Sequence, residues 1–487
     1  MLEHEAAVPM PGAPPTRAPA EQEAGLARVG LWLADWSERW FPDAFVFALA
    51  GVVIVALGAL AIGAPPQAVA LQFGRGFWDL ITFTMQMALI IVGGYVVASS
   101  PPVARLIAWL ATLPRSGRSA VAYVAALSML TSLISWGLSL IFSGLYVREL
   151  VRRQPRMDYR AAGAAAYLGA SSIWALGLSS SAAQLQANPG SIPPALLQIT
   201  GVIPFSETIF LWQSAATALV LLVASVATAY WSAPSDAAAR PAEAFGQPAE
   251  PSRDTLEPRQ RPGEWLEYSP LLTVLIVLLA LGWLLDAFGS QGPMAAISNL
   301  NTYNFLFIMV GLLFHWRPTR FVQSVARAVP ATAGVLIQFP FYAAIAAILT
   351  GAKNPAGTAL SDVLANAFVS ISNQHTFPLL VSAYSAVLGL FVPSGGGKWV
   401  IEAPYVMQAA NTLQVNLGWV VQIYNTAEAL PNLVNPFWML PLMGVLGVRA
   451  RELVGYSILQ LLVHLPIVFF LMWLFAQTLP YHPPVAP

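Results

Sequence analysis

The sequence predicts an all-α polytopic membrane protein, arranged as an inverted-topology repeat with two opposed re-entrant hairpins and broken helices. Of the 487 residues, 57% are hydrophobic and only 9% are charged. Soluble domains carry about 25% charged residues, so this chain cannot cover a water-exposed surface of its own size. The alternation of apolar segments with short basic loops then sets the order and direction of the helices.

Apolar segments of membrane-spanning length recur along the chain. A spanning helix needs roughly 20 mainly apolar residues. Uninterrupted candidates are 44–62, 79–98, 209–231, 269–288, 331–350 and 453–478. Candidates with Ser, Asn, Gly or Pro in their middles are 160–181, 303–316 and 417–446. Two further apolar stretches, 119–147 and 378–411, contain clear breaks.

Basic residues predict the orientation of these segments. All of them except Arg75, Lys353 and Lys398 fall into six clusters, and basic loops stay on the cytoplasmic side of a membrane. The N-terminal segment 1–40 contains one of these clusters, is rich in Ala, Pro and Glu, and lacks the apolar core of a cleaved signal peptide. We therefore expect a cytoplasmic tail and a cytoplasmic N-terminus.

The cytoplasmic location of basic loops also predicts that the two broken stretches are re-entrant hairpins. Segment 119–147 begins and ends beside basic loops but is too short for two full spans, so it enters and leaves on the cytoplasmic side. Segment 378–411, broken at 393–397, then enters from the outside. Opposed hairpins are what an inverted repeat requires. Gln86 and Gln338, each at the eighth position of its span, support the pairing.

The resulting organisation has six parts. They are a cytoplasmic tail (1–40), a first membrane repeat (41–231), a cytoplasmic linker rich in Pro, Ala and Glu (232–267), an extra connecting span (268–302), a second, inverted repeat (303–478) and a C-terminal tail (479–487). The extra span is the element that inverts the second half.

The breaks predict a binding site for a small anion. A half-helix that begins at membrane depth points unpaired N–H groups and a positive dipole end at one spot, which suits a carboxylate. The predicted substrate-binding residues are Ser135, Trp136, Gly137, Ser179, Ser181, Ser394, Gly395, Gly396, Gly397, Asn425, Asn432 and Asn435. Each of them could instead serve only helix packing or interhelical hydrogen bonding.

Two carboxylates are candidates for the coupling ion. Glu402 follows the glycine tip and Glu428 lies in the broken span 417–446. Ionisable groups inside a membrane protein are functional-site hypotheses by default. Lys398 either attracts the anion at the outer mouth or extends its ammonium group to the membrane interface.

Charge, spacing and missing residue types exclude other classes of function. Lys and Arg number 23, as do Asp and Glu, so no overall basic field attracts nucleic acid. The chain has no cysteine, and its five histidines show no metal-binding spacing, so we expect no metal, no cofactor and no enzyme. An intramembrane serine hydrolase that uses Ser179 or Ser181 with His464 is the weakest alternative, and a passive channel is another.

Several motifs carry a resemblance to a known family. They are the stretches 77–80, 85–91, 135–137, 338–342, 392–397, 399–401 and 436–438. With them the chain resembles the bacterial short-chain fatty acid transporter family, part of a superfamily of inverted-repeat ion transporters, over about 35–478. The resemblance implies uptake of short carboxylates such as acetoacetate or butyrate across the bacterial inner membrane, with protons, by alternating access, and a homodimer in membrane lipid.

The substrate and the coupling ion keep alternatives. A carrier of this fold for a dicarboxylate or an amino-acid conjugate, with sodium as the coupling ion, is the second hypothesis. A dicarboxylate favours an arginine clamp, and no arginine lies at membrane depth in the predicted topology. A monocarboxylate therefore fits the pattern better.

Overall fold

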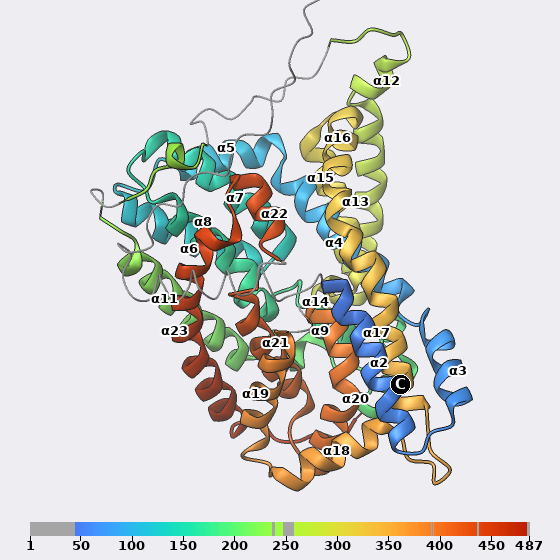
Figure 1. The fold of residues 1–487 in the computed structure, drawn as a ribbon. Helices are drawn as coiled ribbons and strands as arrows, with labels where there is room; N and C mark the ends of the chain where they lie inside the picture. Colours follow the sequence, from blue (N-terminus) through green and yellow to red (C-terminus); the bar gives the residue numbers. More distant parts are fainter. Residues whose placement is uncertain are drawn as a thin grey trace, which may run out of the picture.

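The computed structural model describes residues 44–235, 239–246, 258–390, 392, 394–435 and 438–484. The expected tail 1–40 lies outside them. The described residues form helices and connecting segments without a β-strand (Figure 1). Six of these helical segments are long and apolar enough to cross a membrane. The predicted all-α polytopic class is confirmed.

The described residues of the first half of the chain form ten α-helices. They are α2 (Ala44–Ala61), α3 (Pro66–Gly76), α4 (Ile81–Ala98), α5 (Pro101–Leu110), α6 (Gly117–Ser132), α7 (Trp136–Arg153), α8 (Tyr159–Ser171), α9 (Ser181–Ala187), α10 (Pro194–Thr200) and α11 (Trp212–Ser232).

The second half supplies the remaining described helices. They are α12 (Glu264–Tyr268), α13 (Leu271–Gln291), α14 (Pro293–Ser298), α15 (Leu300–His315), α16 (Pro318–Ala328), α17 (Ala333–Gly351), α18 (Leu360–Ile371), α19 (Phe377–Gly389), α20 (Gly395–Leu413), α21 (Leu417–Asn432), α22 (Leu440–Leu446) and α23 (Ala450–Ala476).

The first predicted hairpin consists of α6 and α7, which pack along each other. Small residues let the arms approach: the Ser139 hydroxyl of α7 donates to the Ser128 carbonyl of α6 at 2.7 Å. An α-helix rises 1.5 Å per residue, so the 16-residue α6 spans about 24 Å. That length is short of the roughly 30 Å hydrocarbon core of a bilayer.

The second predicted hairpin has arms that diverge. Helix α20 lies against α17 and α18, whereas α19 lies mainly against α21. Bulky side chains separate the two arms: the Tyr384 and Tyr405 hydroxyls meet at 2.8 Å, and Phe368 of α18 packs on both rings. The space kept open between the arms holds the ion cluster described below.

Both predicted broken spans are broken in the structure. Helix α8 ends at Ser171, and a 3-10 turn (Ile173–Leu176) and residues 177–180 lead into α9. Gly177 is required there, because a Cβ atom at this position would overlap the backbone of Leu133 at the α6–α7 tip. Helix α21 ends at Asn432, and the chain resumes as α22.

The connecting helix α13 lies at the upper right of the molecule in Figure 1 and packs on α14 and α15. Its outward face is apolar, with Leu279 73% exposed. Part of the preceding linker is docked rather than free: the Tyr159 N–H donates to the Arg240 carbonyl at 2.9 Å, and the Arg240 N–H donates to Asp158 at 3.0 Å.

Candidate functional site

The N-terminus of α20 is the centre of the candidate site. Ser394 caps it, accepting the Gly397 N–H at 3.2 Å, and its carbonyl accepts the Lys398 N–H at 2.8 Å. The N–H groups of Gly395 and Gly396 have no hydrogen-bond acceptor among the described residues. The first turn of a helix leaves such donors free and carries partial positive charge. This terminus can therefore receive an anion.

Aromatic rings explain why three glycines stand at this terminus. A Cβ atom at Gly395 would overlap the indole of Trp174, and one at Gly397 would overlap the ring of Tyr342. At Gly396, a Cβ atom would lie 2.7 Å from the Phe83 ring. The glycines thus let the backbone donors lie directly against an aromatic wall.

The opposite tip, at the start of α7, pairs two of its first-turn donors within the protein. Ser135 caps this helix and accepts the Leu138 N–H at 3.3 Å. The Trp136 N–H donates to the Ser179 hydroxyl at 2.9 Å. Residues 177–180 thus come close enough to satisfy Trp136, so this tip has one fewer N–H group without an acceptor than the Ser394 tip among the described residues: the Gly137 N–H alone.

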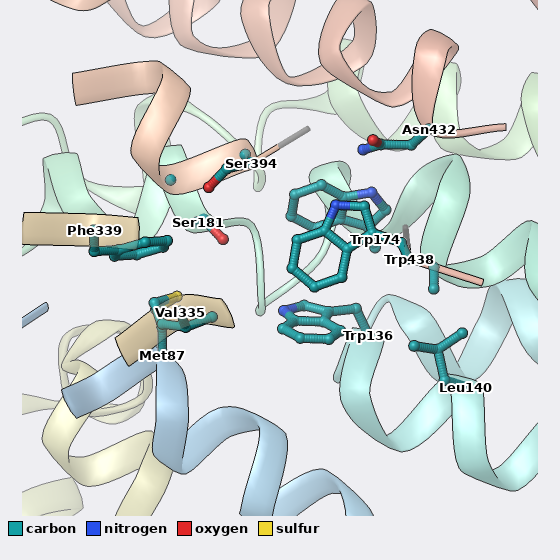
Figure 2. Close-up of a pocket in the computed structure, with 13 residues that line it drawn as sticks. Met87, Trp136, Leu140, Trp174, Ser181, Val335, Phe339, Ser394, Asn432 and Trp438 are labelled. Carbon is teal, nitrogen blue, oxygen red and sulfur yellow. The ribbon is translucent and has the colours of Figure 1, made fainter. Parts of the chain in front are cut away.

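A small cavity of about 30 Å³ lies between the two tips (Figure 2). A site for a water molecule needs roughly 10–15 Å³ on this measure, so the cavity has less room than a four-carbon acid requires. Its walls are mostly apolar. The lining residues are Met87, Trp136, Leu140, Ala170, Trp174, Ser181, Val335, Phe339, Ser394, Gly395, Gly396, Asn432 and Trp438.

A wider cavity of about 660 Å³ adjoins the small one. The two share Trp136, Leu140, Val335, Phe339, Ser394 and Trp438. The wider cavity extends past Gly137 to Arg148 and Arg327, which belong to two of the predicted cytoplasmic clusters. The site therefore has a pathway toward one basic face of the molecule.

The structure brings half of the predicted binding residues together. Trp136, Ser181, Ser394, Gly395, Gly396 and Asn432 line the small cavity, and Gly137 lines the wider one. Ser135, Ser179 and Gly397 support the two tips from behind. The Asn425 side chain instead donates to Gln422 at 2.7 Å, and Asn435 lines neither cavity.

Sequence reasoning missed most of the apolar wall. Trp174 comes from the 3-10 turn after α8, and Trp438 follows the α21 break; Figure 2 shows both indoles beside that of Trp136. The Trp174 Nε1 atom and the Asn432 Oδ1 atom are buried without a hydrogen-bond partner. The sequence does contain a signal for these two wall residues, because each tryptophan lies within a few residues of a predicted helix break.

Behind the glycine tip, α19, α20 and α21 enclose an ion cluster. The Lys398 Nζ atom lies 2.9 Å from Glu428 Oε2 and 3.2 Å from Glu402 Oε2. It also donates to the Ser385 hydroxyl at 2.8 Å and lies 4.4 Å from the centre of the Tyr424 ring. Both sequence interpretations of Lys398 are wrong, because its side chain is fully buried between two carboxylates.

The cluster has more acid than base. Two carboxylates share one ammonium group, so the fully ionised cluster carries one uncompensated negative charge. Glu402 Oε1 and Glu428 Oε1 are buried without a hydrogen-bond partner. An unpaired buried charge is costly, and a bound proton or cation would remove it. The carboxylates predicted to carry the coupling ion therefore lie where one is needed.

The hydrolase arrangement is not formed. The His464 imidazole on α23 lies 2.6 Å from the Ser225 hydroxyl on α11, whereas the Ser179 hydroxyl accepts the Trp136 N–H. Within the described residues, no group of three His, Asp or Glu side chains could hold a metal ion.

Comparisons with known proteins agree with this architecture. A family model described as "Short chain fatty acid transporter" matches residues 25–475. Two relatives bear the name "Putative short-chain fatty acid transporter". The one from Escherichia coli is 32% identical, with 90% of this chain and 97% of the relative covered. The one from Haemophilus influenzae is 30% identical, with 91% and 98% covered.

Two solved structures share the fold. The YdaH transporter of Alcanivorax borkumensis aligns with a TM-score of 0.60 at 16% identity, covering 91% of this chain and 100% of that one. MtrF of Neisseria gonorrhoeae, described with a class of antimetabolite efflux pumps, aligns with a TM-score of 0.54 at 14% identity, covering 94% and 100%. At these identities the likeness shows the fold alone.

Proposed function

The chain belongs to the short-chain fatty acid transporter family, and from this premise we propose that it takes up short-chain carboxylates of the acetoacetate or butyrate type by proton-coupled alternating access. The observation that carries the proposal is the N-terminus of α20, where Gly395 and Gly396, whose N–H groups have no acceptor among the described residues, line a mostly apolar cavity. A short acid has the matching chemistry, with an anionic head and an apolar tail.

In this proposal the carboxylate binds the Gly395 and Gly396 N–H groups and the Ser394 hydroxyl. The acyl chain lies on the indoles of Trp136 and Trp174. No Lys or Arg lines the small cavity, which favours a single carboxylate over a dicarboxylate. Because the cavity is smaller than the substrate, the walls must separate for binding, as alternating access requires.

The proposed topology places the basic clusters on the cytoplasmic side of the bacterial inner membrane, with the N-terminus also cytoplasmic. The wider cavity reaches Arg148 and Arg327, so this conformation corresponds to an inward-facing state. The halves 41–231 and 303–478 are proposed as inverted repeats, supported by their shared order of two helices meeting at a tip and then a broken span. Homodimer assembly stays a prediction.

Protons are the proposed coupling ion, held by Glu402 and Glu428. The support is the uncompensated negative charge of the cluster with Lys398. Sodium could satisfy the same charge, since unpartnered carboxylate oxygens are suitable ligands. Imposing each gradient separately on the reconstituted protein distinguishes the two ions.

The first experiment is uptake of radiolabelled butyrate and acetoacetate into proteoliposomes, with and without an inward proton gradient. Protein-free liposomes run in parallel, because protonated short acids cross lipid unaided. We expect gradient-driven accumulation above this leak, competed by unlabelled short acids. Absence of protein-dependent flux for every short acid would overturn the substrate class.

One observation favours a second candidate, a carrier of larger organic anions such as dicarboxylates or amino-acid conjugates. The wider cavity, about 660 Å³, exceeds what a four-carbon acid fills. Competition of labelled butyrate uptake by these larger anions distinguishes the two candidates. If they compete more strongly than unlabelled butyrate does, the second candidate is favoured.

A further inference from the structure

Asn432 lies between the cavity and the ion cluster. It is the last residue of α21, 1% exposed, and lines the small cavity, as Figure 2 shows. The Tyr167 hydroxyl donates to its carbonyl at 2.9 Å, which fixes the backbone. Glu428 precedes it by one helical turn, and the Asn432 side chain lies against the Glu428 carboxylate.

The Asn432 amide is incompletely satisfied at this position. Its Oδ1 atom is buried and has no hydrogen-bond partner among the described residues, and the same holds for Glu428 Oε1. A buried acceptor without a partner is uncommon in native proteins. Both of these groups belong to a single contact between the binding cavity and the proposed proton site.

We propose that the Asn432 amide couples substrate binding to protonation of Glu428 by reversing which of its two ends faces the cavity. The inference rests on the proposed function and names the residue that links its two parts. Asn432 acts here as a positioning residue, because the proton itself resides on Glu428.

The two orientations of the Asn432 amide follow from which atoms of Glu428 can accept or donate a hydrogen bond in each protonation state. An ionised carboxylate only accepts hydrogen bonds, so ionised Glu428 attracts the amide NH₂ and leaves Oδ1 facing the cavity. There Oδ1 repels the substrate carboxylate. Protonated Glu428 carries an O–H that donates to Oδ1, which turns the NH₂ toward the cavity as a donor for the substrate. The oxygen and nitrogen of the amide are nearly equal in size, so the reversal needs no repacking.

The surroundings of Glu428 favour this relay over movement of the carboxylate. Lys398 of α20 holds Oε2 at 2.9 Å, which leaves Oε1 to take the proton. On α19, a Cβ atom at Gly389 would lie 2.9 Å from Oε2, so the carboxylate already touches that backbone. The other ionisable groups that act on Glu428 are Glu402 and the phenols of Tyr342 and Tyr424. These neighbours confine the carboxylate, whereas the amide can still turn.

The test is equilibrium binding of radiolabelled butyrate to the purified full-length protein in detergent, from mildly acidic to mildly alkaline pH, where butyrate stays ionised. For the wild type we expect the affinity to fall as pH rises, approaching the tenfold per pH unit that one coupled proton allows. Asn432→Leu and Asn432→Ala should bind butyrate more weakly, with an affinity that no longer changes with pH. Glu428→Gln should also lose the pH dependence.

Gln422→Leu is the matched control. It removes a buried amide from the same helix, but this amide donates to the Ser214 hydroxyl at 2.8 Å and lines neither cavity. The control should keep the wild-type pH dependence. Infrared difference spectra add a second measurement: butyrate binding should shift the C=O band of a protonated carboxyl in the wild type, and this band should be missing in Glu428→Gln.

The outcomes separate the two proposals. If Asn432→Leu lowers the affinity by the same factor at every pH, the amide is only a binding contact and the coupling inference is overturned, while the substrate site stands. If the wild type binds no butyrate at any pH, the proposed function fails first. Thermal unfolding identifies a variant that does not fold. In that case the proposal is tested by whether butyrate binding shifts the C=O band of a protonated carboxyl in the wild type.

Discussion

Lys398 of α20 and Glu428 of α21 form a fully buried ion pair, with Nζ and Oε2 2.9 Å apart, directly behind the glycine tip that begins α20. The lysine lies one residue after that tip, so the helix that offers free N–H groups to the cavity also carries the cation of the ion cluster. A shift of α20 would therefore alter the substrate contacts and the ion pair together.

The first prediction concerns the charge balance of this cluster. Lys398→Met should destabilise the protein by about 3–5 kcal/mol, because it leaves two buried carboxylates without their cation. Adding Glu402→Gln and Glu428→Gln to Lys398→Met should recover much of the lost stability. Thermal unfolding of the three proteins in detergent checks this, and an unchanged Tm in the single variant would contradict it.

The second prediction concerns the Ser394 cap. Ser394→Ala should weaken butyrate binding roughly fivefold, the equivalent of about 1 kcal/mol for one neutral hydrogen bond. Ser116→Ala is the matched control, since Ser116 caps α6 with its side chain far from either cavity. Binding measurements on both variants separate a lost substrate contact from a lost helix cap. Equal affinities in the two variants would remove Ser394 from the site.

The third prediction concerns the aromatic wall behind Gly395. Gly395→Ala should strongly reduce uptake, because the added methyl group overlaps the far edge of the Trp174 indole. Trp174→Phe shortens this side chain and should restore part of the uptake in the double variant. Uptake rates in proteoliposomes, corrected for protein incorporation, provide the measurement. Full activity of Gly395→Ala alone would show that the contact is not maintained during transport.

The fourth prediction concerns chain length. Leu140→Ala removes three side-chain heavy atoms from the cavity wall and should move the preference toward longer straight-chain acids. Competition of labelled butyrate uptake by acids of increasing length measures this preference. Leu106→Ala is a control, since Leu106 is 46% exposed on α5 and lines neither cavity. The same order of competition in Leu140→Ala and wild type would place the acyl chain elsewhere.

The fifth prediction concerns the direction of the wider cavity. The chain contains no cysteine, so Gly444→Cys introduces one thiol, at a lining position with open space around its Cα atom. A membrane-impermeant maleimide should label it from the cytoplasmic side, and butyrate should slow the labelling. Labelling only from the opposite side would reverse the proposed orientation.

Local patterns were enough to predict the positions of the helices and their breaks. The predicted span 331–350 appears as α17, and the predicted break around Ser135 is a helix N-cap. Glycine, serine and proline act on their own backbone, so such breaks can be identified from short windows of sequence. The same windows were sufficient to single out Ser394 and its glycines as the start of a helix, which in the structure lines the small cavity.

The sequence by itself thus determined the membrane class, the broken helices and the residue types at each tip, because hydropathy and capping act within a few neighbouring residues. Only the tertiary structure decided that Ser179 accepts the Trp136 N–H, while the Gly395 and Gly396 N–H groups find no acceptor among the described residues. It also decided that Lys398 is buried against Glu428 and that Asn432 joins the cavity to the cluster. These contacts join separate helices, and whether a donor, a charge or an indole finds a partner depends on how those helices pack.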